Sequence, residues 1–473
     1  MRRENKGAFL LIIGVTLAII MISSGKVSAQ SAQEERRIEQ EKRDVLAETE
    51  LQILKGEKSL LFDCGGWVDY RYDNYTDDDN DSSSADTLDD EFSADVRLWL
   101  KAIFRPAADT AYTNEHSLYV RLKNLIIERR PGDLAGGYDN DGPHLDYGYL
   151  VLDFNPLWFE LGRRYFSVGR GIAYSNVNDG SAVFLELEDL SIKGFFAHTL
   201  PHEDNVDASV PGWDKESDRN FYGLETSYNV TENHDLYGYI VVQRDDSGED
   251  PDEPRHNYTY NSQYFGLGLE GAITQNTNYW AELIRQTGES YIFDNNQRAD
   301  VDAWAGDFGM MYNWDVYSRP SLYVEYAFGT GDADRESVTD TQGGNTQGDD
   351  TNFLYFGYLP AGYTLSPRLS NIHFIKAGAI LNPLEKFRFF KNFSFGVDCY
   401  RYFKYKEGGG IYDVDATLND TDIGFEVDLT LNWQVFSDLK CSLQYGTFSP
   451  GDAYPDNTDD REEYLYTGFT FTF

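Results

Sequence analysis

Residues 425–435 read FEVDLTLNWQV, and apolar and polar side chains alternate along them without a break. Six apolar residues occupy one parity of this stretch and five polar residues occupy the other. Because successive side chains of a strand point to opposite faces, the pattern predicts a β-strand with one apolar and one polar face. Such a strand belongs either to a transmembrane barrel or to a half-buried sheet of a soluble protein.

The same alternation recurs along most of the chain. Between residues 92 and 104, one parity carries Phe, Ala, Val, Leu, Leu, Ala and Phe, and the other is mostly polar. The end of the chain, EEYLYTGFTFTF (462–473), places Leu465, Phe469 and Phe473 on one face. In all, the pattern predicts about eighteen strands, centred near residues 66, 98, 121, 150, 161, 184, 194, 225, 239, 267, 281, 306, 323, 376, 398, 428, 443 and 468.

The connections between these segments alternate in length. Short ones lie at 155–156, 188–189, 230–233 and 317–320, and long acidic ones at 74–89, 130–143, 200–218, 245–260, 330–370 and 448–461. Short turns on one side and long loops on the other are typical of outer-membrane barrels. A soluble sandwich or propeller is the alternative, but it needs shorter strands. We therefore expect an all-β fold, a transmembrane antiparallel barrel of about eighteen strands over residues 59–473.

The N-terminus differs from the rest of the chain. Residues 1–29 combine a basic start, an apolar run and a small-residue cleavage site, which predicts a secretory signal peptide; a membrane anchor is the alternative. Residues 30–58 are charged and lack proline, which predicts a short polar helix in the periplasm. No later apolar run is long enough for a membrane helix, so a membrane location requires a closed barrel. We expect the outer membrane of a Gram-negative-type bacterium.

The composition excludes several partners. Eighty Asp and Glu face 40 Lys and Arg, which opposes non-specific binding to nucleic acid or to anionic surfaces. The acidic runs are interpreted as solvated loops, with divalent-cation sites as the alternative. Three cysteines do not make a disulfide framework.

The sequence gives little sign of catalysis. No G-x-S-x-G nucleophile motif occurs, and Pro201 breaks any helix that would align His198 with His202. We expect no enzyme activity, no bound metal and no cofactor. A purely structural or adhesive barrel remains an alternative to a channel.

Strand parity predicts which charges face the lumen. Leu157, Phe159 and Leu161 fit the lipid face, so Glu160 and Arg164 point inward. An inward set of Arg and Lys attracts anions, and Arg suits carboxylates because of its planar donor geometry. Interleaved acids, among them Asp95 and Glu160, are expected to hold the basic groups in place. The other basic residues that parity places in the lumen are Arg97, Lys101, Arg105, Arg121 and Lys123. The alternative is that these are the ordinary lumen charges of any porin.

Aromatic residues gather near the segment ends, where girdles at the two membrane interfaces are expected. The clusters are Tyr70 with Tyr72, Tyr312 with Trp314, and Tyr400 with Tyr402 and Phe403. The terminal aromatics are expected to face lipid, with the last strand closing the barrel.

Three stretches resemble the alginate-export family of outer-membrane proteins: FELGRRYFSVGRG (159–171), YVEYAFGTGDAD (323–334) and NIHFIKAGAILNP (371–383). The resemblance implies an eighteen-strand barrel with an Arg-rich constriction that passes a polyuronate from the periplasm to the exterior. It also implies that Arg163, Arg164 and Arg170 contribute to that basic region, although Arg163 has the outward parity unless a bulge intervenes.

The expected function is therefore passive export of an anionic, alginate-like polysaccharide, with outer-membrane lipid and periplasmic export machinery as partners. A general diffusion porin for small solutes is the alternative. The loop at 330–370 is expected to act as an extracellular lid or to fold into the pore.

Overall fold

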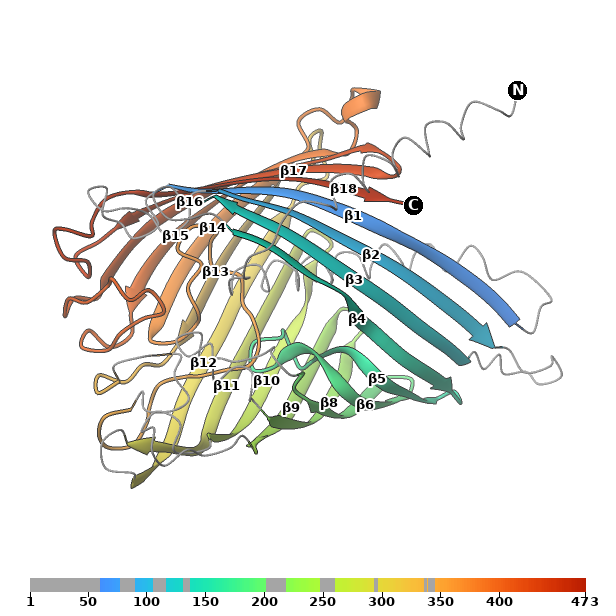
Figure 1. Ribbon diagram of the computed structural model, residues 1–473. Helices are drawn as coiled ribbons and strands as arrows, with labels where there is room; N and C mark the ends of the chain where they lie inside the picture. Colours follow the sequence, from blue (N-terminus) through green and yellow to red (C-terminus); the bar gives the residue numbers. More distant parts are fainter. Residues whose placement is uncertain are drawn as a thin grey trace.

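The chain forms one closed barrel of eighteen antiparallel strands (Figure 1). The sheet closes because β1 (Leu60–Thr76) pairs with both β2 (Asp90–Phe104) and β18 (Glu462–Thr472). The computed structural model describes residues 60–76, 90–104, 116–130, 137–200, 218–246, 260–292, 297–335, 338 and 345–473. The remaining strands are β3 (His116–Arg130), β4 (Gly137–Asp153), β5 (Leu157–Ser167), β6 (Ser175–Glu186), β7 (Leu190–His198), β8 (Arg219–Thr231), β9 (His234–Asp245), β10 (Asn261–Thr274), β11 (Thr277–Ile292), β12 (Gln297–Asn313), β13 (Ser321–Gly329), β14 (Ile372–Leu381), β15 (Phe393–Lys404), β16 (Asp422–Phe436) and β17 (Leu439–Pro450).

The predicted barrel is confirmed. Each of the eighteen segment centres expected from the alternation lies inside one of the eighteen strands. The predicted signal peptide (1–29) and polar helix (30–58) lie outside the described residues. Among the residues that are described, no helix is both long and apolar enough to cross a membrane.

The two faces of each strand follow the parity of the sequence. On β2, the Leu98 side chain points outward and is 50% exposed, whereas the neighbouring Arg97 points inward and is 4% exposed. At the end of the chain, Phe469 and Phe473 are exposed on the outer face, and Tyr466 is buried inside. Two backbone hydrogen bonds of 2.9 and 3.0 Å join Gly66 to Phe473 and help to close the barrel. An apolar outer band around a polar interior is typical of a barrel in lipid.

One of the expected aromatic girdle clusters is wrong. Tyr312 and Trp314 are exposed on the outer surface as predicted, but Tyr400 and Tyr402 are buried inside the barrel. The Tyr402 hydroxyl donates hydrogen bonds to the carbonyl of Ala361 and to the Glu426 carboxylate, at 2.7 and 2.9 Å. These two tyrosines therefore belong to the lumen and support an internal loop.

Among the described connections at the long-loop end, two turn into the barrel. They are the β5–β6 loop (168–174) and the β13–β14 loop (330–371), and they pair with each other at Tyr174 and Phe356. The Phe356 amide donates to Ala173 at 3.1 Å, and the Tyr358 amide donates to Gly171 at 2.9 Å. The loops and the surrounding wall share one buried aromatic core. The expectation that the 330–370 stretch folds into the pore is thus confirmed for its described part.

Gly357 permits this close pairing. A Cβ atom at that position would lie 2.0 Å from the carbonyl oxygen of Gly171 and 2.2 Å from that of Ile172. Backbone oxygens cannot move aside as a flexible side chain would, so the approach of the two loops requires a residue without a side chain.

Candidate pore constriction

Basic side chains line one inward wall of the barrel, formed by β2 to β5. On β2 and β3, Arg97 lies directly opposite Lys123, and Lys101 lies opposite Tyr119. Arg121 lies between these levels and stacks over Tyr147 of β4, with its guanidinium carbon 3.9 Å from the ring centroid. We call this set the basic wall; its members are Arg97, Lys101, Arg121, Lys123 and Arg164.

Carboxylates within the same wall bind most of these cations. Arg97 makes a bidentate contact with Asp95, at 2.7–3.0 Å. One Asp146 oxygen bridges Arg97 and Arg121, at 3.1 and 2.5 Å. Asp146 occupies a bulge in β4, where the register with β3 shifts. Such multiple contacts fix a guanidinium in place and neutralise much of its charge.

A cation of the basic wall is also paired with an acid of its own strand on β5. Arg164 forms an ion pair with Glu160, four residues earlier in the chain, and its guanidinium lies 5.3 Å from the ring of Phe166 and 5.5 Å from that of Phe184. Asp95 and Glu160, the two acids expected to hold basic groups in place, thus bind Arg97 and Arg164.

Two residues expected in the pore are not part of this wall. Arg163 lies on the outer face of β5 with Leu161, where it binds Asp179 of β6 through two contacts of 2.9 and 3.0 Å. No bulge reverses its parity, because β5 and β6 pair in unbroken register. This placement corrects the expectation that Arg163 lines the pore. Arg105 lies outside the described residues.

Arg170 lies in the β5–β6 loop and reaches the opposite wall. Its backbone amide donates to Glu282 of β11 at 2.8 Å, and its Nε donates to Asp307 of β12 at 2.6 Å. The Gly169 amide donates to Glu225 of β8 at 3.3 Å. The Arg170 side chain keeps 28% of its surface exposed. It is thus a lumen cation, but it lies across the barrel from the basic wall.

The β13–β14 loop is fastened at two places on the wall. Near β10 and β11, the Tyr264 hydroxyl donates to the Leu354 carbonyl at 2.7 Å, and the Leu354 amide donates to Gln286 at 2.9 Å. Five strands further round the barrel, the amides of Tyr363 and Thr364 donate to Glu426 of β16 at 2.7 and 2.8 Å. The segment between these points therefore crosses part of the lumen and narrows it.

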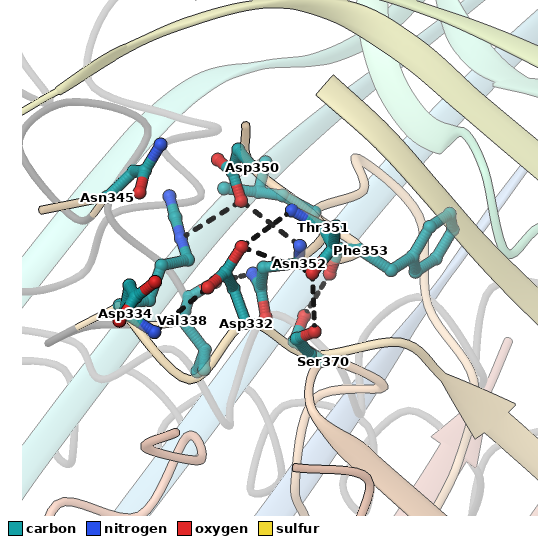
Figure 2. Close-up of polar contacts among 12 residues, drawn as sticks. Asp332, Asp334, Val338, Asn345, Asp350, Thr351, Asn352, Phe353 and Ser370 are labelled. Carbon is teal, nitrogen blue, oxygen red and sulfur yellow. Dashed lines mark hydrogen bonds and ion pairs between the residues drawn. The ribbon is translucent and has the colours of Figure 1, made fainter. Parts of the chain in front are cut away.

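The base of this loop is folded by its own polar side chains (Figure 2). Asp332 accepts hydrogen bonds from the amides of Asp334 and Thr351, at 2.9 and 2.8 Å. The backbone amide of Asn352 donates to the Asp350 carboxylate at 3.0 Å, and its side-chain amide donates to the Val338 carbonyl at 3.0 Å. Burial raises the pKa of Asp350, an effect that the nearby Arg335 partly offsets. These contacts reverse the chain direction so that residues 353–370 run inside the barrel.

Carboxylates dominate the wall that faces these loops, from β11 to β16. Lys376 of β14 lies 4.0 Å from Glu325 and 3.7 Å from Asp398. Tyr323 donates a hydrogen bond to Asp398. We call this set the acidic wall; its members are Glu282, Asp307, Glu325, Asp398, Glu426 and Asp428. Glu282 and Glu426 are fully buried because they hold the two inward loops.

Sequence reasoning missed the acidic wall and Lys376 as site residues. Parity alone indicates that they face inward, since the polar face of the opening stretch contains Glu426 and Asp428. Parity does not identify the partner that each carboxylate binds. The contacts of Glu426 with residues 363–365 span more than 60 positions in the chain, and no local pattern reports them.

The family model for alginate export matches residues 205–467, which is more than half of the chain. The chain belongs to the alginate export family. No curated protein sequence matches it.

Several solved structures show the same fold, among them that of an outer-membrane protein. OccAB4 of Acinetobacter baumannii is 12% identical with a TM-score of 0.56, and the match covers 87% of this chain and 98% of that one. OprD of Pseudomonas aeruginosa is 11% identical with a TM-score of 0.52, covering 87% and 94%. OccD3 of the same species is 12% identical with a TM-score of 0.53, covering 88% and 93%. At this identity the likeness concerns the fold.

This alginate-export family member is thus an outer-membrane β-barrel channel. Its location in the outer membrane of a Gram-negative bacterium, expected from the sequence, is confirmed by the family and the barrel.

Proposed function

We propose that this channel exports an anionic polysaccharide, of the polyuronate type, passively from the periplasm to the exterior. The observation that carries the proposal is the basic wall of β2 to β5 in a member of the alginate export family. A polyuronate presents one carboxylate per sugar ring, and an inward row of Arg and Lys provides matching donors at successive heights. No cofactor or covalent step is needed for such transport.

The pairing of the basic wall fits passage better than tight binding. Asp95, Asp146 and Glu160 already neutralise part of the charge on Arg97, Arg121 and Arg164. A passing carboxylate then exchanges with a wall carboxylate instead of meeting a bare cation. Conduction needs binding that is favourable enough for entry and weak enough for release. Periplasmic export machinery is proposed as the supplier of the polymer.

A second candidate function is general diffusion of small solutes. The acidic wall favours it, because six carboxylates on β11 to β16 attract cations and repel polyanions. In this case the basic wall only completes the mixed lumen lining that wide barrels commonly have.

The reversal potential of the purified channel in a planar bilayer under a salt gradient separates the two functions. We expect anion selectivity and block of the current by added polyuronate. Cation selectivity without block would overturn the export proposal in favour of a general porin. A barrel with no conductance would contradict both functions.

Matched variants locate the effect in the lumen. Arg164→Gln removes one positive charge from the basic wall and is expected to reduce block by polyuronate. Arg285→Gln removes the same charge from the outer face, where Arg285 binds Asp302 at 3.0 Å. The control is expected to conduct and to be blocked like the parent channel. Equal behaviour of the two variants would contradict a role for the basic wall.

A further inference from the structure

The β14–β15 turn (382–392) has an unusual composition for this acidic chain. It reads NPLEKFRFFKN, with three basic residues against one acid and three phenylalanines. It contains the 3-10 helix η2 (Arg388–Phe390). Phe387 and Phe389 are 61% and 52% exposed, and Lys386, Arg388 and Lys391 are also exposed. Large apolar side chains combined with cations at a surface mark a contact site.

The turn lies against the outside of the barrel wall. Phe390 stacks on Trp433 of β16 at a centroid distance of 4.9 Å, and Phe389 meets the same ring edge-on at 5.0 Å. The Trp433 indole donates to the Phe389 carbonyl at 3.2 Å. Trp433 shares the parity of Phe425, which is exposed on the apolar outer face. The turn therefore extends the lipid-facing surface and does not cross the pore.

The neighbouring β12–β13 turn fixes this position from the side. The Tyr317 hydroxyl donates to the Pro383 carbonyl at 2.6 Å, and the Asn382 amide donates to the Ser318 carbonyl at 2.7 Å. Arg319 pairs with Glu385 at 2.8 Å. These contacts join two turns at the barrel end that carries the short connections, which is the periplasmic end in outer-membrane barrels. The outer surface there carries Tyr312, Trp314, Tyr317, Phe387, Phe389 and Trp433.

We propose that the β14–β15 turn is a membrane-interface anchor that binds phospholipid of the periplasmic leaflet. Phe387 and Phe389 insert at the apolar edge of that leaflet, next to Trp433. Lys386, Arg388 and Lys391 bind the phosphate groups of the lipid heads. Two features favour lipid over a protein partner: the patch is continuous with the lipid-facing wall through Trp433, and its three exposed cations suit the phosphate groups of anionic phospholipids.

A polarity-sensitive fluorophore on Phe387→Cys tests the depth of the turn. Cys64, Cys399 and Cys441 are replaced by Ser, and the full chain is inserted into vesicles of phosphatidylethanolamine and phosphatidylglycerol with brominated acyl chains. We expect blue-shifted emission that the bromines quench. The matched control carries the label at Asp438→Cys, in the short β16–β17 turn at the same end, and is expected to report water without quenching.

Water-like emission from position 387, equal to that of the control, would overturn the proposal. The same result followed by a blue shift on adding periplasmic extract would point to a protein partner and would also overturn it.

The cations are tested separately with the triple variant Lys386→Gln, Arg388→Gln, Lys391→Gln. In the parent chain we expect more quenching by bromines on phosphatidylglycerol than by bromines on phosphatidylethanolamine, and loss of this preference at high salt. The triple variant is expected to lack the preference while keeping the blue shift. Heat-dependent gel migration confirms that each variant is folded. A preference that survives in the triple variant would contradict phosphate binding by these residues.

Discussion

The basic wall and the acidic wall face each other across one lumen, but their charges have different partners. On the basic wall, Arg97 and Arg164 bind acids of their own strands, two and four residues away. On the acidic wall, Glu282 and Glu426 accept backbone amides from loops far away in the chain. The basic wall is therefore held by acids of its own strands, including Asp146 of β4, whereas the acidic wall depends on the two inward loops.

This difference shows that the sign of the lumen charge does not follow from a count of residues. Carboxylates that hold a loop are buried and saturated with donors, so they contribute less to the path of a passing ion than exposed ones do. Arg170 is 28% exposed, and Arg164 is 15% exposed, whereas Glu426 is fully buried. The net charge of −40 thus says little about the ion that the constriction prefers.

The largest expected effect comes from releasing the β13–β14 loop. Glu426→Ala removes the carboxylate that accepts the Thr364 and Leu365 amides, and one of the two that accept the Tyr363 amide, the other being Asp428. Hydrogen bonds to a charged group contribute about 2 kcal/mol each. The variant therefore loses several kcal/mol of the free energy that stabilises the inward position of the loop. We expect a larger single-channel conductance with more frequent current fluctuations, measured in a planar bilayer.

Asp398→Ala is the matched control for this variant. It removes a carboxylate of the same wall that binds Tyr323 and Lys376 but no loop amide. Its conductance is expected to stay close to that of the parent channel, with a shift in selectivity alone. If both variants open the channel equally, the loop is not held by Glu426, and the contrast between the two walls fails.

A smaller effect is expected at Arg164, a partly buried cation of the basic wall. Arg164→Glu changes the local charge by two units and places a second carboxylate next to Glu160. One unit charge acting at about 8 Å in a water-like medium contributes roughly 0.5 kcal/mol. The change of about 1 kcal/mol hinders the anion and favours the cation by equal amounts, so the anion-to-cation permeability ratio should fall about thirtyfold, as measured by the reversal potential. An unchanged ratio would mean that Arg164 does not line the ion path.

Alternation of side chains was sufficient to predict the barrel. Each strand centre could be placed because lipid and water impose opposite demands on the two faces. The same reasoning failed at Tyr400 and Tyr402, because the stretch 397–403 carries apolar or aromatic residues on both parities. Only the packing of Phe374 and the 361–365 loop against these tyrosines shows that they face inward.

Only the inward or outward direction of single side chains in the candidate site could be predicted from the sequence. Parity placed Arg97, Arg121 and Arg164 in the lumen, and it marked Arg163 as the residue of opposite face. Neither the bulge that inserts Asp146 nor the route of Arg170 to Asp307 leaves a signal in the sequence. Both depend on pairings between segments distant in the chain, where many alternative contacts have similar local patterns.

The smallest expected effect sharpens the comparison from the side of the basic wall. Asp146→Asn removes the charge that Arg97 and Arg121 share, while the amide oxygen still accepts one hydrogen bond. One negative charge less should raise the anion-to-cation permeability ratio about sixfold, because it favours the anion and hinders the cation by roughly 0.5 kcal/mol each; the sign is opposite to that for Arg164→Glu. Polyuronate block should become stronger and slower to reverse, because the polymer then competes with Asp95 alone at Arg97 and no longer with the Asp146 charge at Arg121. Faster reversal would mean that Asp146 itself helps to hold the cations in their binding geometry, and the basic wall would then require its acids for recognition as well as for release.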